Sequence, residues 1–500
     1  MGTRTAEGLS SRLLWVTTRR GSAVLSSVAA LLVAILVSAW VGPQPMHLGF
    51  ETDGDTRLAD RVRAILGADG TDGSTAGYHG LAVVVVSPGQ TRWAGLGNSG
   101  EGMAPTNTTM FEIGSITKLF TGLLLADAVD HGVVRLQDTL QSYLPPLVGT
   151  PAGAATLEEL ATHTSGLPAY ADETTGATYE GSGSSDVESI TQADVIQQAA
   201  GLTITQEASY AYSNLGFALL GYALAKAEGA PSWTALVTQR VLRPAGMTHT
   251  VFVPSTADVP DDSAVGSLPD GLFAPYSVGP SYFPAGTATF STLDDLASFA
   301  RWVIDGSAIG PSALDPRYAI SSVDSIGLAW MITTTTTGVS VWHDGSVPGF
   351  SSILGFDLAR RRAVAVLGNT DASVDPLGMK LLEPRSPVAV PSAPWPVPGI
   401  AALACVVAVG CVLLAARLGR WTVAVAVTCA AQTGLALAVL YLPWQNLPGW
   451  SWAFASGAVS AATILGVDRG FHSRRQVVLP LVVSVLTAFA FYALTVRLVS

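Results

Sequence analysis

The sequence has few charged residues, and this shortage already excludes several classes of protein. Charged residues make up 13% of the 500 residues, whereas an ordinary soluble chain is about 25% charged. Hydrophobic residues reach 49% and the mean hydropathy is +0.41. This composition excludes a disordered chain, a coiled coil and a fully soluble protein. We therefore expect a membrane component.

Cysteine, clustered histidine and basic charge are also lacking. The three cysteines, Cys405, Cys411 and Cys429, all lie in apolar C-terminal stretches, so the acidic part before them has neither a disulfide nor a thiol nucleophile. The seven histidines are scattered without an HExxH motif, so we expect no metal and no cofactor. Residues 42–398 hold 16 Lys and Arg against 35 Asp and Glu, and this excess of acid excludes a nucleic-acid-binding face.

Long apolar runs occur near both ends of the chain. Arg19 and Arg20 precede a run over residues 23–41, which is either a transmembrane anchor or a signal peptide. Four later runs predict transmembrane helices at about 397–416, 421–442, 450–467 and 477–496. Arginines occur in residues 1–22 and in two of the three loops between the late runs, and the positive-inside rule places these segments in the cytoplasm. We expect a multi-pass protein of the cell membrane, with the lipid bilayer as a partner and residues 42–398 extracytoplasmic.

The extracytoplasmic segment divides into three parts. Residues 42–56 are a predicted tether, residues 57–383 a folded domain, and residues 384–398 a proline-rich linker that spaces rather than folds. Within the domain, Thr174–Ser189 is rich in glycine and serine, which is typical of a surface loop or lid. Gly95–Gly100 matches the GxGxxG pattern, but no helix is predicted after it, so the context of a dinucleotide site is missing.

Hydrophobic periodicity predicts helices in the middle of the domain and strands at both ends. The predicted helices span residues 60–66, 110–131, 156–162, 215–228, 232–240 and 293–304. The predicted strands span residues 81–87, 91–97, 327–334, 339–343, 352–356 and 363–367. This order predicts an α+β fold in which the first hairpin completes the late sheet. Thr156 and Glu159 have the spacing of a capping box.

A serine and a lysine at the start of the long helix carry the chemistry. Ser115 and Lys118 form an S-x-x-K motif, and three residues on a helix place both side chains on one face. A buried lysine has a lowered pKa and can take the proton of a serine hydroxyl, which makes the serine a nucleophile. The chain has only three lysines, so a lysine inside an apolar helix indicates a function. Tyr212-Ser213-Asn214 and His343-Asp344-Gly345 follow downstream.

With these three motifs the sequence resembles the serine β-lactamase and penicillin-binding-protein superfamily. It is most similar to the branch that holds class C β-lactamases, D,D-carboxypeptidases and related esterases, over roughly residues 56–383. The blocks that carry the resemblance are Phe111–Thr121, Leu160–Pro168, Tyr212–Gly221, Pro244–Thr250, Ala285–Ala300 and Trp342–Ser352. The resemblance implies an antiparallel sheet flanked by helices plus an all-helical domain, followed in this chain by the α-helical membrane bundle.

The resemblance also implies the catalytic residues. Ser115 is the acylated nucleophile, and Lys118 and Tyr212 transfer protons, either of them being a possible base. The backbone N–H groups of Ser115 and Ser346 form the oxyanion hole. His163, in the block LATHTSGLP, is expected to hold a turn rather than to react.

The substrate-binding residues implied are Asn214, His343, Gly345 and Ser346. His343 stands where β-lactamases of the superfamily usually carry lysine, and Asp344 faces away from the site if His343 faces it. A neutral histidine holds a substrate carboxylate less firmly than lysine, which disfavours efficient β-lactam hydrolysis.

We therefore predict a membrane-tethered serine hydrolase that acts through an acyl-enzyme on a small-molecule, peptide or ester substrate, with cell-wall compounds among the candidates. The activity would be that of a D,D-carboxypeptidase or esterase. A true β-lactamase is the alternative among enzymes. An inactive or slowly deacylating ligand sensor, coupled to the membrane bundle, is the alternative of another class.

Overall fold

The computed structural model describes residues 46–67, 77–100, 102–171, 187–204, 209–268, 273–336 and 338–383. The predicted spans at 23–41 and 397–496, the linker at 384–398 and most of the predicted loop at 174–189 lie outside these residues. Within the described part of the chain, no helix combines the length and the apolar character needed to cross a membrane.

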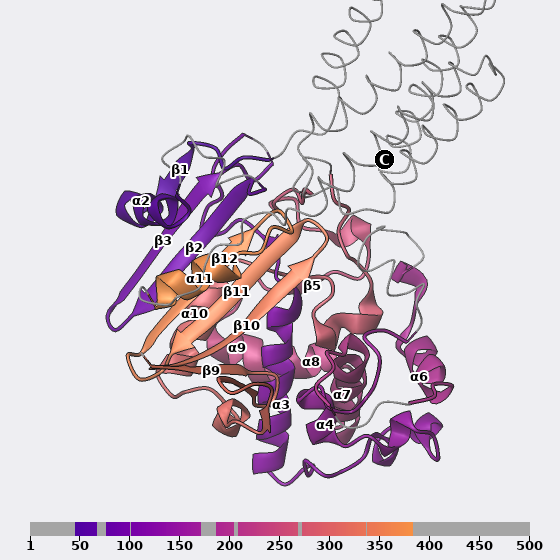
Figure 1. Cartoon of the computed structure of the whole chain (residues 1–500). Helices are drawn as coiled ribbons and strands as arrows, with labels where there is room; N and C mark the ends of the chain where they lie inside the picture. The colour runs from indigo at the N-terminus through magenta and orange to yellow at the C-terminus, as the bar shows by residue number, and fades with distance from the viewer. Residues whose placement is uncertain are drawn as a thin grey trace, which may run out of the picture. The chain divides into compact units, whose positions relative to one another are not determined.

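A nine-stranded antiparallel sheet forms one layer of the domain (Figure 1). Its order is β1-β3-β2-β12-β11-β10-β9-β8-β7. The bounds are β1 (Thr52–Gly54), β2 (Gly80–Ser87), β3 (Gln90–Gly97), β7 (Tyr318–Ala319), β8 (Asp324–Ile326), β9 (Met331–Thr335), β10 (Gly338–Val347), β11 (Phe350–Asp357) and β12 (Arg362–Gly368). Because β2 pairs with β12, with Val83 opposite Val366, the prediction that the first hairpin completes the late sheet is confirmed.

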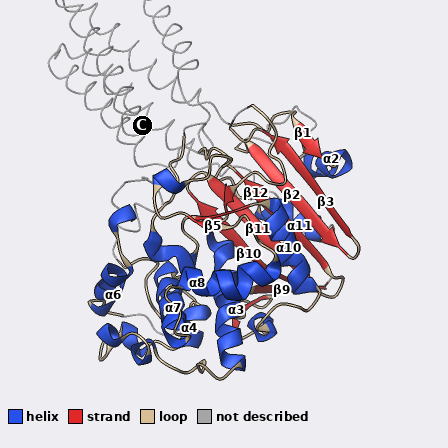
Figure 2. Ribbon diagram, turned by 180° about the vertical axis from the view of Figure 1, so that it is seen from behind, coloured by secondary structure: helices blue, strands red, loops and turns tan. Residues whose placement is uncertain are grey.

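The helices lie on both faces of this sheet and in a separate cluster beside it (Figure 2). They are α2 (Thr56–Ile65), α3 (Thr117–Asp130), α4 (Leu157–Ala161), α6 (Gln192–Ala200), α7 (Asn214–Ala227), α8 (Trp233–Val237), α9 (Arg243–Ala245), α10 (Leu293–Ile304) and α11 (Asp375–Leu382). A small sheet of β4 (Phe111–Glu112), β6 (Thr289–Ser291) and β5 (Val251–Phe252) joins the two regions. Two 3₁₀ segments matter for the site, η1 (Gly114–Ile116) and η9 (Pro280–Ala285).

Helix α3 is the centre of the fold. It runs between the large sheet and the cluster of α4, α7 and α8 (Figure 1), and residues 117–128 are all buried. A helix that is apolar on every side is stable only when it is surrounded by other elements. The sheet also has a second core on its far face, because alternate residues of a strand point to opposite sides: in β2, Ala82 and Val84 join the α3 side, whereas Leu81 and Val83 pack with α2 and α11.

Several local predictions are confirmed, and two are wrong. Helix α10 spans the predicted residues 293–304 and is capped by Thr292, and Thr156 and Glu159 form the predicted capping box. The long helix does not begin directly after Thr109, because residues 111–112 pair in the small sheet and the helix starts only at 117. The predicted strand 327–334 is interrupted, since Ala329 has a positive φ of 75° and the chain turns there between β8 and β9.

Candidate active site

Ser115 lies on a tight turn between β4 and α3 rather than within a regular helix. Gly114 has φ +53°, a left-handed conformation that glycine adopts without steric cost. The turn is held from the sheet side, since Ser352 Oγ in β11 donates a hydrogen bond to the carbonyl oxygen of Ile113 at 2.8 Å. The local sequence therefore folds Ser115 into η1, with its side chain only partly buried.

The backbone of strand β10 packs directly against the backbone of this turn. A Cβ atom on Gly345 would lie 2.2 Å from the carbonyl oxygen of Ile113 and 3.0 Å from the amide nitrogen of Ser115. A Cβ atom on Gly114 would lie 3.1 Å from the amide nitrogen of Ser346. Such a close approach requires glycine at these positions, and it places the segments that carry the two expected oxyanion-hole N–H groups, those of Ser115 and Ser346, against each other.

Lys118 is fully buried one turn along the chain from Ser115. Its Nζ donates to Ser115 Oγ at 2.8 Å, to Asn214 Oδ1 at 2.7 Å and to the carbonyl oxygen of Ala285 in η9. Burial lowers the pKa of Lys118 well below its usual value, because a charged amine loses its hydration there, while Asp344 partly opposes this shift.

The beginning of α7 supplies the next two groups. Ser213 caps this helix, its hydroxyl accepting the N–H of Gly216, and the cap fixes the residues on either side of it. Tyr212, before the cap, donates its hydroxyl proton to Ser115 Oγ at 2.7 Å. Asn214, after the cap, reaches Lys118. Burial of the Tyr212 hydroxyl raises the pKa of the phenol well above 10, although 39% of the residue surface remains exposed.

His343 in β10 is buried, and its ring centre lies 6.5 Å from that of Tyr212. Its Nδ1 lies 2.6 Å from the carbonyl oxygen of Asp344. Because a carbonyl only accepts, Nδ1 carries the proton, and burial lowers the pKa of the ring. Asp344 lies opposite Ile353, which packs with α11 on the far face of the sheet. The expectation that Asp344 faces away from the site is therefore confirmed.

His163 is buried in the turn after α4, with φ 58°. Its carbonyl oxygen accepts the N–H of Ala211 at 2.8 Å, and its Nδ1 accepts the N–H of Ser213 at 3.1 Å. The His163 and Tyr212 ring centres are 4.3 Å apart. The expected turn is present, and the ring also touches the tyrosine of the candidate site.

Two buried carboxyl groups that hold backbone N–H groups of other segments were missed by the sequence reasoning. Glu112, three residues before Ser115, accepts the N–H groups of Ala288 and Ser277, and burial raises its pKa to about 8. The sequence did carry a signal for Glu112, since an acidic residue within the mostly apolar block Phe111–Thr121 indicates a buried and hydrogen-bonded carboxyl group. Glu112 ties the nucleophile segment to the loop that includes Ala285, whose carbonyl oxygen holds Lys118.

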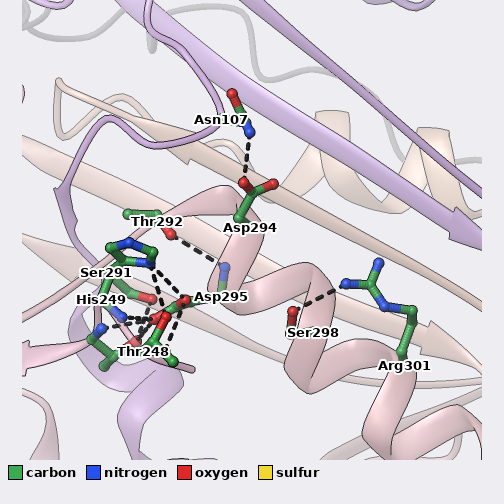
Figure 3. Close-up of polar contacts among 10 residues, drawn as sticks. Asn107, Thr248, His249, Ser291, Thr292, Asp294, Asp295, Ser298 and Arg301 are labelled. Atoms are coloured by element: carbon green, nitrogen blue, oxygen red, sulfur yellow. Dashed lines mark hydrogen bonds and ion pairs between the residues drawn. The ribbon is translucent and has the colours of Figure 1, made fainter. Parts of the chain in front are cut away.

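The second missed carboxyl group is Asp295 in α10 (Figure 3). It accepts the backbone N–H groups of Thr248, His249 and Thr250 and the hydroxyl of Thr250. This network joins the segment before β5 to α10. The aspartate pair Asp294-Asp295 after the Thr292 cap reads in sequence only as a favourable first turn of a helix, so nothing there signals the network.

The structure thus brings residues from three distant motifs together. Ser115, Lys118, Tyr212 and Asn214 form one hydrogen-bonded group. Gly345 and Ser346 lie against the nucleophile turn, and His343 lies beside Tyr212. Among the described residues, no three His, Cys, Asp or Glu side chains are grouped as metal ligands would be. The arrangement is suited to nucleophilic attack by Ser115.

Comparisons with known proteins give a family match and several relatives. The family model described as Beta-lactamase matches residues 58–382. The D-alanyl-D-alanine-carboxypeptidase/endopeptidase AmpH of Escherichia coli K12 is 35% identical over 185 residues, which are 36% of this chain and 47% of that protein. A Beta-lactamase of Pseudomonas fluorescens is 33% identical over 181 residues, 35% of this chain and 47% of the relative. The matches therefore span just under half the length of these relatives.

A solved structure shows the likeness in fold. The octameric penicillin-binding protein homologue from Pyrococcus abyssi has a TM-score of 0.55 with this chain at 22% sequence identity. The match covers 65% of this chain and 75% of that one. The predicted α+β fold of the domain is therefore confirmed.

Proposed function

The chain belongs to the beta-lactamase family of serine hydrolases, and we propose that it cleaves an amide or ester bond through an acyl-enzyme formed on Ser115. The observation that carries this proposal is the pair of hydrogen bonds that Lys118 and Tyr212 make to the Ser115 hydroxyl. Since a similar protein is a D-alanyl-D-alanine-carboxypeptidase/endopeptidase, small peptides and their ester analogues, cell-wall compounds included, are the first substrates to test.

Lys118 is the general base in this proposal. A neutral lysine amine has two N–H donors and one lone pair. The oxygens of Asn214 and Ala285 take the two donors. In this neutral form the 2.8 Å contact between Nζ and Ser115 Oγ reverses its direction, so that the serine hydroxyl donates its proton to the lone pair. Burial favours this neutral form of Lys118, whereas the raised pKa of Tyr212 means that the phenol keeps its proton.

Acylation then follows from the positions of these groups. Ser115 Oγ attacks the substrate carbonyl carbon as its proton passes to Lys118, and the backbone N–H groups of Ser115 and Ser346 stabilise the negative oxygen. Tyr212 gives its proton to the leaving amine or alcohol as the bond to the carbonyl carbon breaks, and Lys118 returns a proton to Tyr212. Water later attacks the ester on Ser115, releases the acid and restores the hydroxyl.

A β-lactamase is the second candidate, and the similarity to a Beta-lactamase of Pseudomonas fluorescens favours it. A β-lactam is a cyclic amide, so the same groups would open it. Turnover of a chromogenic cephalosporin by the full chain, at a rate far above that of matched peptide esters, would favour this candidate over the first.

The proposal also includes the location of the enzyme. The arginine distribution around the five apolar runs supports an extracytoplasmic catalytic domain on a chain held in the cell membrane. A single cysteine introduced at exposed Gln90 would test this in whole cells. Labelling by a membrane-impermeant maleimide in intact cells is expected, and labelling only after lysis would contradict the orientation.

The chemistry is tested by intact-mass analysis of the full chain in detergent after treatment with a neutral fluorophosphonate. One adduct is expected, and Ser115→Ala is expected to prevent it. The control is Ser346→Ala, which removes a hydroxyl near the nucleophile but keeps the backbone N–H. No adduct on a folded protein would contradict the hydrolase proposal, and a stable adduct with each candidate substrate would favour the slowly deacylating sensor.

A further inference from the structure

The segments that supply the site have almost no basic residues. Residues 93–134, 136–225, 244–300 and 318–359 hold every site residue named above, and Lys118 is the only Lys or Arg among them. The second of these segments carries ten Asp and Glu. A cation is the strongest partner that a protein offers to a substrate carboxylate, and these segments offer one lysine.

Lys118 already makes its hydrogen bonds within the protein. Lys118 Nζ is surrounded by three oxygens of the protein. Elsewhere in the described residues, Arg240 pairs with Asp127 at the far end of α3, and Arg317 pairs with Glu158. Lys226 is exposed near the end of α7, twelve residues from Asn214, or about 18 Å along the helix.

The remaining charge near the site is negative. His343 is no substitute for a cation, because its ring is buried, burial lowers the pKa of the ring, and its Nδ1 proton is donated to a backbone carbonyl. The Asp344 side chain is 43% exposed, and its carboxylate acts on Lys118, Tyr212 and His343 in the same direction, raising the pKa of each. No arginine acts on these three groups among the described residues.

We propose that the substrate has no carboxylate next to the bond that is cleaved, and that the site takes neutral or amine-bearing esters and amides. This inference rests on the proposed function and narrows it. A free C-terminal carboxylate, as a carboxypeptidase substrate has, and the carboxylate of a β-lactam would both meet a site whose described residues offer the Asp344 carboxylate nearby and no free cation.

A matched pair of depsipeptides tests this. Both are N-acylglycyl esters of lactic acid, one with the lactate carboxylate free and one with it as the methylamide. We expect kcat/KM of the full chain to be about tenfold or more higher for the methylamide at low salt, and the ratio to shrink as salt screens the site. His343→Lys is expected to lower the ratio at least tenfold, whereas Gln90→Lys, which adds the same charge at an exposed turn, is expected to leave it unchanged.

The outcomes separate this inference from the hydrolase proposal. A preference of the wild type for the free acid would overturn the inference, even with Ser115 labelled by the neutral fluorophosphonate. An unchanged ratio in His343→Lys, with Ser115 still labelled, would also count against it. Failure of the wild type to label would instead remove the proposed function.

A different observation concerns His163 and Tyr212. His163 binds the residue before Tyr212 with its carbonyl oxygen, the residue after it with Nδ1, and the Tyr212 ring with its own ring. Since Nδ1 accepts an N–H, the proton lies on Nε2, which is buried and has no hydrogen-bond partner among the described residues. The hydrogen bonds that the carbonyl oxygen and Nδ1 of His163 accept therefore both run to the neighbours of Tyr212 in the chain.

We infer that His163 is a positioning residue that fixes the Tyr212 hydroxyl against Ser115. His163→Phe keeps a ring but loses the acceptor, and His163→Asn keeps an acceptor but loses the ring. We expect His163→Phe to lower kcat about tenfold to a hundredfold with little change in KM. His163→Asn, which keeps the acceptor, is expected to lower kcat less than His163→Phe does.

A double-mutant cycle separates positioning from general support of the fold. If His163 acts through Tyr212, His163→Phe is expected to have no further effect on kcat in a Tyr212→Phe background. Independent effects, with kcat losses that multiply, would overturn the inference. Thermal unfolding of each variant shows that the protein compared is folded.

Discussion

Replacing Gly345 with alanine tests whether the approach of β10 to the nucleophile turn determines activity. The added Cβ would lie 2.2 Å from the carbonyl oxygen of Ile113 and 2.4 Å from Ser352 Oγ. An ordinary carbon–oxygen contact is about 3.3 Å or more, so β10 and the turn must separate by roughly 1 Å. The Ser352 hydroxyl can rotate away, but the Ile113 carbonyl is held in the backbone that leads to Ser115.

The expected magnitudes follow from this displacement. Overpacking of a buried site costs about 1–3 kcal/mol of stability, and a shift of about 1 Å in reacting groups can cost about a hundredfold in rate. In the Gly345→Ala variant, the fluorophosphonate should therefore label Ser115 roughly a hundred times more slowly than in the wild type. The unfolding temperature should fall by only a few degrees.

The matched control is Gly355→Ala in the neighbouring strand β11. Its added Cβ would meet only Leu382 Cδ2 at 3.2 Å and Trp342 Cβ at 3.7 Å, and the leucine end can move. We expect wild-type labelling of Ser115 and a change in unfolding free energy within about 1 kcal/mol. Labelling of Gly345→Ala at the wild-type rate would refute the argument that this glycine sets the geometry of the site.

Three further predictions concern the buried charges. Asn214→Asp places a carboxylate beside Lys118, raises the pKa of the amine and should move the rising limb of the acylation pH profile upward by about one to three pH units; an unmoved limb would exclude Lys118 as the base. The folded state raises the Glu112 pKa from 4.5 to about 8, so it holds a proton between these values that the unfolded chain releases. Stability should therefore fall as pH rises across that window, by at most about 1.4 kcal/mol per unit for this group, and Glu112→Gln should flatten the slope measured by thermal unfolding. Asp295→Asn should cost about 2–3 kcal/mol, because an amide donor then faces the N–H groups of Thr248–Thr250; chemical denaturation at constant pH measures it, and an unchanged midpoint would show that the network is dispensable.

The sheet could be predicted from sequence because strands such as β2 and β12 are short apolar runs rich in valine, buried on both faces, and glycine or proline marks the turn of the first hairpin. The β2–β3 hairpin turns at Pro88-Gly89, between the two predicted strands, and its pairing with β12 follows from the α+β order. The error after Thr109 has a physical cause. Residues 111–112 are apolar enough to continue a helical pattern, but their backbone pairs with β6, and a positive φ at Gly114 ends the strand.

The reacting residues could be predicted from the motifs, whereas the groups that hold the surrounding structure in place could not. Ser115 and Lys118 stand out because lysine is rare in this chain and the two residues have the S-x-x-K spacing, and Tyr212 stands out through the Y-x-N motif. The carbonyl oxygen of Ala285 has no sequence signal, since every residue has one, and its position depends on the conformation of η9. Glu112 and Asp295 are ordinary acidic residues in sequence and acquire their roles only when the fold buries them.

The three groups around the Ser115 hydroxyl depend on different parts of the fold. Lys118 belongs to α3 in the core, Tyr212 precedes α7 in the helical cluster, and the oxyanion N–H of Ser346 is carried by β10 in the sheet. The site therefore forms only where the two regions pack against α3. A small slip between them would separate the nucleophile from a proton acceptor or from the N–H groups while each region stayed folded. Activity should for this reason be lost before global unfolding on heating, and Ser115 labelling should fall at a lower temperature than the far-ultraviolet circular dichroism signal.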